Sequence, residues 1–98
     1  MKRIVMFYGR ECPYSQAVMP MIDKLKEEGI AIIDKREVWH DEQNEALRED
    51  YADILERDCE RKTIVPSFVD PMEKRALCNP KDYVELNTWI LKKEKGSD

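Results

Sequence analysis

The chain has 98 residues, of which 42% are hydrophobic and 39% charged, with a net charge of −4 at pH 7. A chain of this length forms one domain, and its negative charge disfavours nucleic-acid binding, which depends on basic patches. No apolar run approaches the roughly 18 residues that span a bilayer, so no membrane contact is expected. We therefore predict one domain over residues 1–95, a disordered tail at 96–98, no signal peptide, a cytoplasmic location and a monomer.

The first part of the chain carries alternating strand and helix signals. Arg3–Tyr8 is a short, continuous apolar run, which is typical of a strand buried on both faces. Pro13 suits the first position of a helix, and apolar residues recur at helical spacing from there until Gly29, which ends the helix as a left-handed cap. Ile30–Asp34 predicts a second strand, with an extension toward Trp39 left open.

The second part predicts one more helix, a hairpin and a last helix. Residues 41–60 form an acidic amphipathic pattern that indicates a single helix. Thr63–Asp70 resembles a strand, but Pro66 cannot donate to a central ladder and belongs at an edge, a bend or a strand start. Arg75–Cys78 is the expected hairpin partner, and Asp82 helps to cap the last helix. The order β-α-β-α-β-β-α predicts an α/β fold, with a four-stranded mixed sheet flanked by three helices.

The strand-to-helix junction carries the sequence Cys12-Pro13-Tyr14-Ser15. A thiol at a helix N-terminus faces unpaired N–H groups and the positive end of the helix dipole, and both favour the thiolate. Arg10, two residues earlier, adds positive charge and is included among the substrate-binding residues. Because thiolate is the species that attacks disulfides, Cys12 is the predicted catalytic nucleophile.

These residues also carry a family resemblance. The segment IVMFYGRECPYS resembles the start of a glutaredoxin, whose usual active site is Cys-Pro-Tyr-Cys, and TIVPSFVD resembles the family's Thr-Val-Pro segment and third strand. The resemblance covers nearly the whole chain, apart from a longer link over residues 35–62. It implies a thioredoxin-like fold and a thiol–disulfide oxidoreductase acting on protein disulfides or glutathione mixed disulfides. It also implies glutathione as co-substrate, with no permanently bound cofactor or metal.

The resemblance assigns roles to several further positions. Pro66 corresponds to the family's cis-proline, beside the active-site cysteine. The backbone of Val65 is expected to pair with the substrate as an added strand. Pro13 and Tyr14 shape the turn, and Tyr14 is expected to contact substrate. Asp82 is expected to meet the ammonium group of glutathione, although residues 76–82 lack the glycine pair that the family usually carries there.

Ser15 stands where the family has its resolving cysteine. Three explanations remain open: a natural monothiol enzyme, a Cys-to-Ser change introduced by engineering, or lost activity. The rivals to the enzyme are therefore a redox-inactive thioredoxin-like binding module and an iron–sulfur carrier. The redox interpretation requires the sulfur of Cys12 to be reachable from solvent and Pro66 to lie close to it.

The other two cysteines add a further expectation. Three cysteines are an odd count and imply no disulfide framework, so in a reducing compartment we expect Cys12, Cys59 and Cys78 to be free. Cys78 is placed in the substrate-binding region. Either it or Cys59 serves as an alternative resolving thiol, or each is a small buried residue. Their spacings match no standard ligand pattern, which disfavours a metal site built from the three cysteines and His40.

Overall fold

The computed structural model of the chain describes residues 1–92. Its four strands form one mixed sheet, in which β2 (Ala31–Glu37), β1 (Lys2–Tyr8), β3 (Ser67–Asp70) and β4 (Arg75–Cys78) lie side by side in that order. β1 pairs with β2 in parallel and with β3 antiparallel, and β4 is an antiparallel edge strand. The predicted α/β class and mixed sheet are confirmed. The elements are β1 (Lys2–Tyr8), α1 (Pro13–Glu27), β2 (Ala31–Glu37), α2 (Glu42–Asp50), α3 (Ala52–Cys59), β3 (Ser67–Asp70), β4 (Arg75–Cys78) and α4 (Tyr83–Leu91).

β1 is a central strand, which explains its continuous apolar sequence. Ile4 and Met6 point into the core shared with α1 and α4. Val5 and Phe7 point into a second core, which includes Leu55 of α3. Side chains alternate across a strand, so both faces of β1 are apolar because both are covered by helices.

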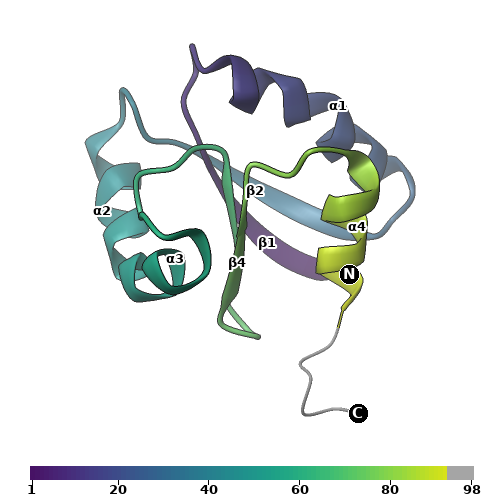
Figure 1. Cartoon of the computed structure of the whole chain (residues 1–98). Helices are drawn as coiled ribbons and strands as arrows, with labels where there is room; N and C mark the ends of the chain where they lie inside the picture. Colours follow the sequence, from purple (N-terminus) through teal and green to yellow (C-terminus); the bar gives the residue numbers. More distant parts are fainter. Residues whose placement is uncertain (93–98) are drawn as a thin grey trace.

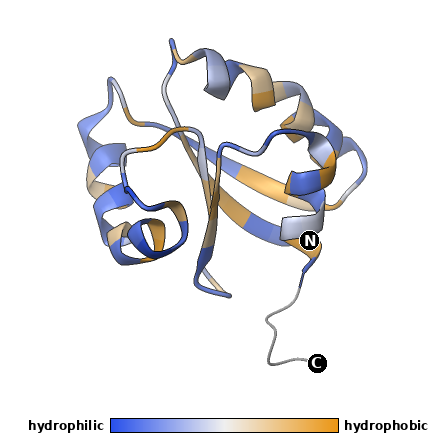
Figure 2. Ribbon diagram, viewed as in Figure 1, coloured by the Kyte–Doolittle hydropathy of each residue, from blue (hydrophilic) through white to orange (hydrophobic). Residues whose placement is uncertain are grey.

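Figure 1 shows this layering, with α1 and α4 on one side of the sheet and α2 and α3 on the other. Hydrophobic segments mark the strands between these layers, whereas α2 is mostly hydrophilic (Figure 2). α2 has no buried residue, although α3, which follows it directly, buries Leu55 and Cys59. The predicted arrangement of helices on both faces is therefore confirmed.

The prediction of three helices is wrong within residues 1–92, because residues 41–60 form two helices. Tyr51 separates them, with φ −107° and ψ 14°, outside the helical region. Its ring lies against Phe7, with centroids 6.2 Å apart. The break at Tyr51 starts a new helix axis, along which α3 packs Leu55 and Cys59 onto the sheet.

Several strand bounds also differ from the prediction. β2 extends to Glu37, because its parallel ladder with β1 continues to the pair Tyr8 and Glu37. β3 begins only at Ser67, so Pro66 stands immediately before the strand, one of the placements expected for proline. Gly29 has φ 68°, the left-handed conformation predicted at the end of α1.

The hairpin between β3 and β4 is held by a buried carboxylate. Asp70 is 1% exposed, and one of its oxygens accepts hydrogen bonds from the backbone N–H groups of Met72 and Glu73. The other oxygen lies 3.0 Å from Lys2 Nζ and 3.3 Å from Arg75 Nη2. Burial raises the pKa of Asp70, but the hydrogen bonds from Lys2 and Glu73 and the two cationic charges outweigh burial, so the pKa is lowered.

The tail predicted to be disordered, residues 96–98, lies outside the described residues. Among the helices of residues 1–92, none combines the length and apolar character needed to cross a membrane.

Candidate functional site

The candidate site is centred on Cys12, which is the N-cap residue of α1. The Cys12 N–H donates to the carbonyl of Gly9 at 3.0 Å, and the Cys12 carbonyl accepts from the Gln16 N–H. Pro13 follows at the first helical position, as predicted. A tight turn after β1 therefore presents the thiol at the helix N-terminus.

The thiol faces the segment that precedes β3. Cys12 Sγ lies 4.0 Å from the carbonyl oxygen of Val65, and the peptide bond between Val65 and Pro66 is cis, as the resemblance predicted. The Pro66 carbonyl accepts from the Asn79 N–H at 2.9 Å and so belongs to the sheet. Within residues 1–92 the Val65 N–H makes no hydrogen bond, which leaves it open to another strand.

Cys12 itself is 5% exposed and counts as buried. The redox interpretation requires a reachable sulfur, so this burial counts against it. Attack on a disulfide needs access to the sulfur. In this conformation access is restricted to the small exposed fraction of the residue.

Ser15 is fully buried, and its hydroxyl has a structural contact. Its Oγ accepts a hydrogen bond from the Gly9 N–H at 3.2 Å. A buried backbone donor without a partner is costly, so this bond stabilises the turn that carries Cys12. The sequence predicted Ser15 only as the place of a resolving thiol and missed this contact.

Two of the residues expected to contact substrate, Tyr14 and Arg10, are exposed beside Cys12. Tyr14 is 63% exposed, as expected for a residue that meets a substrate. Arg10 is also exposed, and its Nε lies 3.5 Å from a carboxylate oxygen of Glu11. Its charge is therefore shared with a carboxylate beside the thiol.

Glu37, at the end of β2, is a site residue that the sequence analysis missed. Its carboxylate accepts three backbone N–H groups, from Arg10 at 2.9 Å, Trp39 at 3.2 Å and His40 at 2.8 Å. Burial raises the pKa of Glu37, but these hydrogen bonds outweigh burial and lower the pKa. The anionic Glu37 side chain thus ties the turn before Cys12 to the loop after β2.

Glu11 and His40 form a second link between the same two loops. His40 Nε2 lies 2.7 Å from Glu11 Oε1, and this hydrogen bond is the main cause of the lowered pKa of Glu11. The ligand atoms of Glu11, Glu37 and His40 all lie within 4.8 Å of one another. An imidazole and two carboxylates are donors suited to zinc. Glu37, however, already accepts three hydrogen bonds, and the Glu11–His40 pair is satisfied without an ion.

The expectation that Cys59 and Cys78 are free is wrong in this structure, because they form a disulfide. The reason is the packing of α3 along the outer edge of β4. Asp58 accepts the Ala76 N–H at 2.8 Å, and the two cysteine Cα atoms lie 5.7 Å apart, within the usual range for a disulfide. Of the three cysteines, which all lie within residues 1–92, Cys12 alone is free, and neither of the others is available here as a resolving thiol.

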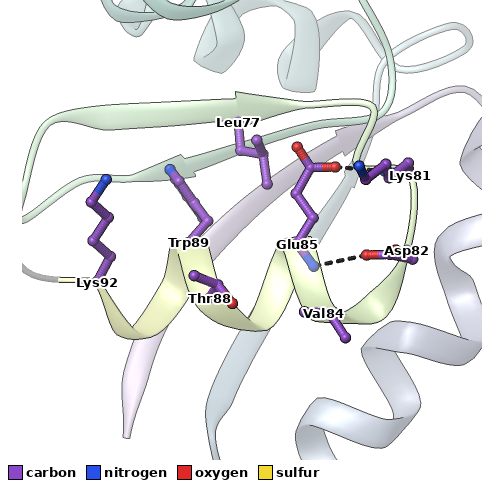
Figure 3. Close-up of a pocket in the computed structure, with 8 residues that line it drawn as sticks. All are labelled: Leu77, Lys81, Asp82, Val84, Glu85, Thr88, Trp89 and Lys92. Carbon is purple, nitrogen blue, oxygen red and sulfur yellow. Dashed lines mark hydrogen bonds between the residues drawn. The ribbon is translucent and has the colours of Figure 1, made fainter.

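Asp82 has the helix-capping role that the sequence predicted, whereas its contact with the ammonium group of glutathione stays a prediction. It is the N-cap of α4, and its carboxylate accepts the Glu85 N–H at 2.9 Å, while Glu85 accepts the Lys81 N–H at 2.8 Å. Figure 3 shows these two contacts in a pocket between β4 and α4. The lining of this pocket does not include Cys12. The carboxylate of Asp82 therefore caps its own helix, and the pocket is distinct from the thiol site.

The Cys12 site is therefore a thiol at a helix N-terminus, beside an open backbone edge and two ionised carboxylates. Such an arrangement suits nucleophilic sulfur chemistry, if a disulfide can reach the thiol. Comparison of this chain with protein-family models, with curated proteins and with solved structures finds no match.

Proposed function

We propose that the chain is a thiol–disulfide oxidoreductase with a thioredoxin-like, glutaredoxin-type fold, in which Cys12 is the nucleophile. The observation that carries the proposal is the position of Cys12 Sγ at the N-terminus of α1, 4.0 Å from the Val65 carbonyl oxygen. This geometry places the thiol at the positive end of a helix dipole, beside a backbone edge that can hold a substrate strand.

The proposed reaction begins with the thiolate of Cys12. It attacks one sulfur of a protein disulfide or of a glutathione mixed disulfide, and the other sulfur leaves as a thiolate. The substrate backbone pairs with Val65, which aligns the scissile bond with the attacking sulfur. Ser15 cannot resolve the mixed disulfide, so a second thiol such as glutathione attacks it and restores Cys12. The net change is a thiol–disulfide exchange, in which one sulfur of the substrate leaves as a thiolate and the other ends in a new disulfide with the resolving thiol.

The experiment that tests this proposal is mass spectrometry of the intact protein after incubation with oxidised glutathione. We expect one glutathione adduct, mapped by proteolysis to Cys12, that a second thiol removes. The Cys12→Ser variant is the matched control and gains no adduct. A wild-type protein that gains no adduct under these conditions contradicts the proposal.

A redox-inactive binding module is the second candidate, and the burial of Cys12 favours it. The Ser15→Cys variant separates the two, because it supplies the second thiol of a dithiol active site. If Ser15→Cys and the wild type both fail to reduce a mixed disulfide in a coupled assay, the binding module is the better account. Activity in either protein supports the oxidoreductase.

The cytoplasmic location stays a prediction. Disulfides such as Cys59–Cys78 are rare in cytosolic proteins, because that compartment keeps thiols reduced. The redox state of this pair in the protein isolated from its native source is therefore informative about where the chain works.

A further inference from the structure

Trp39 is an exposed aromatic residue held next to the turn that carries Cys12. Its side chain lies directly against Gly9, because a Cβ atom built on Gly9 would overlap the indole ring. The carbonyl of Gly9 in turn accepts the Cys12 N–H. The backbone N–H of Trp39 is fixed by Glu37, and the residue nevertheless remains 50% exposed. One side of the indole is thus packed on the turn and a large part of the residue stays open to solvent.

Such a residue suits contact with an apolar side chain of a partner. An aromatic ring whose position is already fixed loses little conformational freedom on binding. Tyr14, two residues after Cys12, is 63% exposed and supplies a second aromatic surface near the thiol. Val65 adds a backbone N–H without a partner in residues 1–92, next to the carbonyl that faces the sulfur. Two exposed aromatic side chains therefore flank the turn that carries the thiol, and one open strand edge faces its sulfur.

The charges near the thiol are unfavourable for a small anionic substrate. Glu11 and Glu37 lie on the two loops beside Cys12, and hydrogen bonds favour the ionised form of both carboxylates. Arg10 is the nearby cation, and its Nε lies 3.5 Å from Glu11. At the N-terminus of α4, Asp82 and Glu85 bind backbone N–H groups with their own carboxylates. A free tripeptide with two carboxylates, such as glutathione, would meet like charges beside the thiol, whereas Lys81 supplies a cation at the N-terminus of α4.

We infer that the preferred substrate of Cys12 is a disulfide carried by an extended polypeptide with an apolar side chain next to the attacked cysteine, which packs on Trp39. This inference rests on the proposed function and specifies its substrate class. The chemistry is one exchange step. The Cys12 thiolate forms a bond to the peptide sulfur, the peptide's original S–S bond breaks, and the other sulfur leaves as a thiolate with the electron pair.

The test compares three mixed disulfides that share 5-thio-2-nitrobenzoate as the leaving group. The thiol components are the peptides Gly-Leu-Cys-Leu-Gly-amide and Gly-Ser-Cys-Ser-Gly-amide, and glutathione. Release of the coloured thionitrobenzoate gives the second-order rate constant for each. We expect the wild type to react about tenfold faster with the leucine peptide than with the serine peptide or glutathione, as about 1.4 kcal/mol of apolar contact provides.

The Trp39→Ser variant is expected to lower the ratio of leucine-peptide to serine-peptide rates about tenfold, which brings it close to one. Trp39→Phe should retain most of the ratio. Val84→Ser, which removes an exposed apolar side chain from α4, is the matched control and should leave the ratio unchanged. A ratio that survives Trp39→Ser, or that Val84→Ser lowers equally, overturns the inference.

The wild type alone also decides the question, even if Trp39→Ser fails to fold. A wild type that reacts with all three compounds but shows no preference for the leucine peptide overturns the inference and leaves the proposed function standing. A wild type that releases no thionitrobenzoate from any of them removes the proposed function, and this inference with it.

Discussion

The chain uses cysteine in two different ways, as a free thiol in one region and as a disulfide in another. Cys12 is a single thiol at a helix N-terminus, close to the carbonyl that precedes β3. Cys59 and Cys78 are joined in a disulfide that fastens the end of α3 to the end of β4. Cys12 lies beside the segment that precedes β3, whereas the disulfide includes the last residue of β4.

The difference lies in what surrounds each sulfur. Cys12 has helix N–H groups and an open backbone edge nearby, and no second thiol. The disulfide lies where α3 covers the outer edge of β4, with the Asp58 carboxylate accepting the Ala76 N–H. The hydrogen bond from Arg57 is the main cause of the lowered pKa of Asp58. A covered edge strand is protected from pairing with other chains, and the disulfide reinforces that cover. We therefore expect Cys12 to decide reactivity and the disulfide to decide stability.

The largest expected effect is the loss of all disulfide exchange in Cys12→Ser. The only free thiol is removed, so no nucleophilic sulfur remains. A Cys59→Ala, Cys78→Ala double variant should keep the exchange rate of the wild type under conditions in which the variant is folded. Thionitrobenzoate release measures both, and residual exchange in Cys12→Ser would show that the disulfide pair takes part after all.

The same double variant also tests whether the disulfide stabilises the fold. The disulfide joins two cysteines that are 19 residues apart in the sequence. By the chain-entropy account, such a bond raises the unfolding free energy by about 3 kcal/mol. We expect that loss in urea unfolding of the double variant. Wild-type protein should show a similar loss on reduction, whereas the double variant should be insensitive to reductant. Equal stability with and without the bridge would mean that it is not a structural link.

Asp70 stabilises the turn of the β3–β4 hairpin, whereas the disulfide lies at the other end of β4. Asp70→Asn is expected to cost about 2 kcal/mol, because it weakens hydrogen bonds between charged groups. The folded-state pKa of Asp70 is lowered, so its contribution is present above about pH 4 and is lost as pH falls through the folded-state pKa. As the pH is lowered through this acid range, the unfolding free energy measured in urea should therefore fall less steeply for Asp70→Asn than for the wild type. Parallel pH curves would contradict this role.

The smallest expected effect comes from Ser15, next to the reactive thiol. Ser15→Ala leaves the buried Gly9 N–H without a partner and should lower the unfolding free energy by about 1 kcal/mol. Ser15→Cys, in contrast, supplies a second thiol, and we expect the glutathione adduct on Cys12 to become short-lived. Urea unfolding and adduct mass measure the two changes. An unchanged stability in Ser15→Ala would mean that the turn does not depend on this hydrogen bond.

The elements with a regular apolar pattern could be predicted from the sequence. The strand ending at Tyr8, the helix from Pro13 to Gly29 and the partner strand Arg75–Cys78 agree closely with the structure. Each has a repeating pattern or a turn residue with one preferred conformation. The cis bond at Pro66 followed from a family resemblance, because proline alone adopts it in only about 5–6% of cases.

The remaining features depend on contacts between distant segments. The break at Tyr51 reflects packing on Phe7, and the helical pattern of residues 41–60 gives no sign of it. The Cys59–Cys78 bond depends on α3 reaching the edge of β4, which residue spacing does not reveal. Glu37 accepts hydrogen bonds from backbone N–H groups of two loops, and one of these donors, Arg10, lies 27 residues earlier in the chain. A sequence pattern does not report such partners, because any residue has a backbone N–H to offer.

The measurement that tests the central claim most directly is the rate at which iodoacetamide alkylates Cys12 at neutral pH, with the modified residue identified by peptide mapping. The account predicts a faster reaction than that of an unstructured cysteine peptide under the same conditions, because a nucleophile at the N-terminus of α1 has to be both accessible and reactive. A rate equal to or below that of the peptide would mean that Cys12 is an inert, buried residue, and would contradict the account.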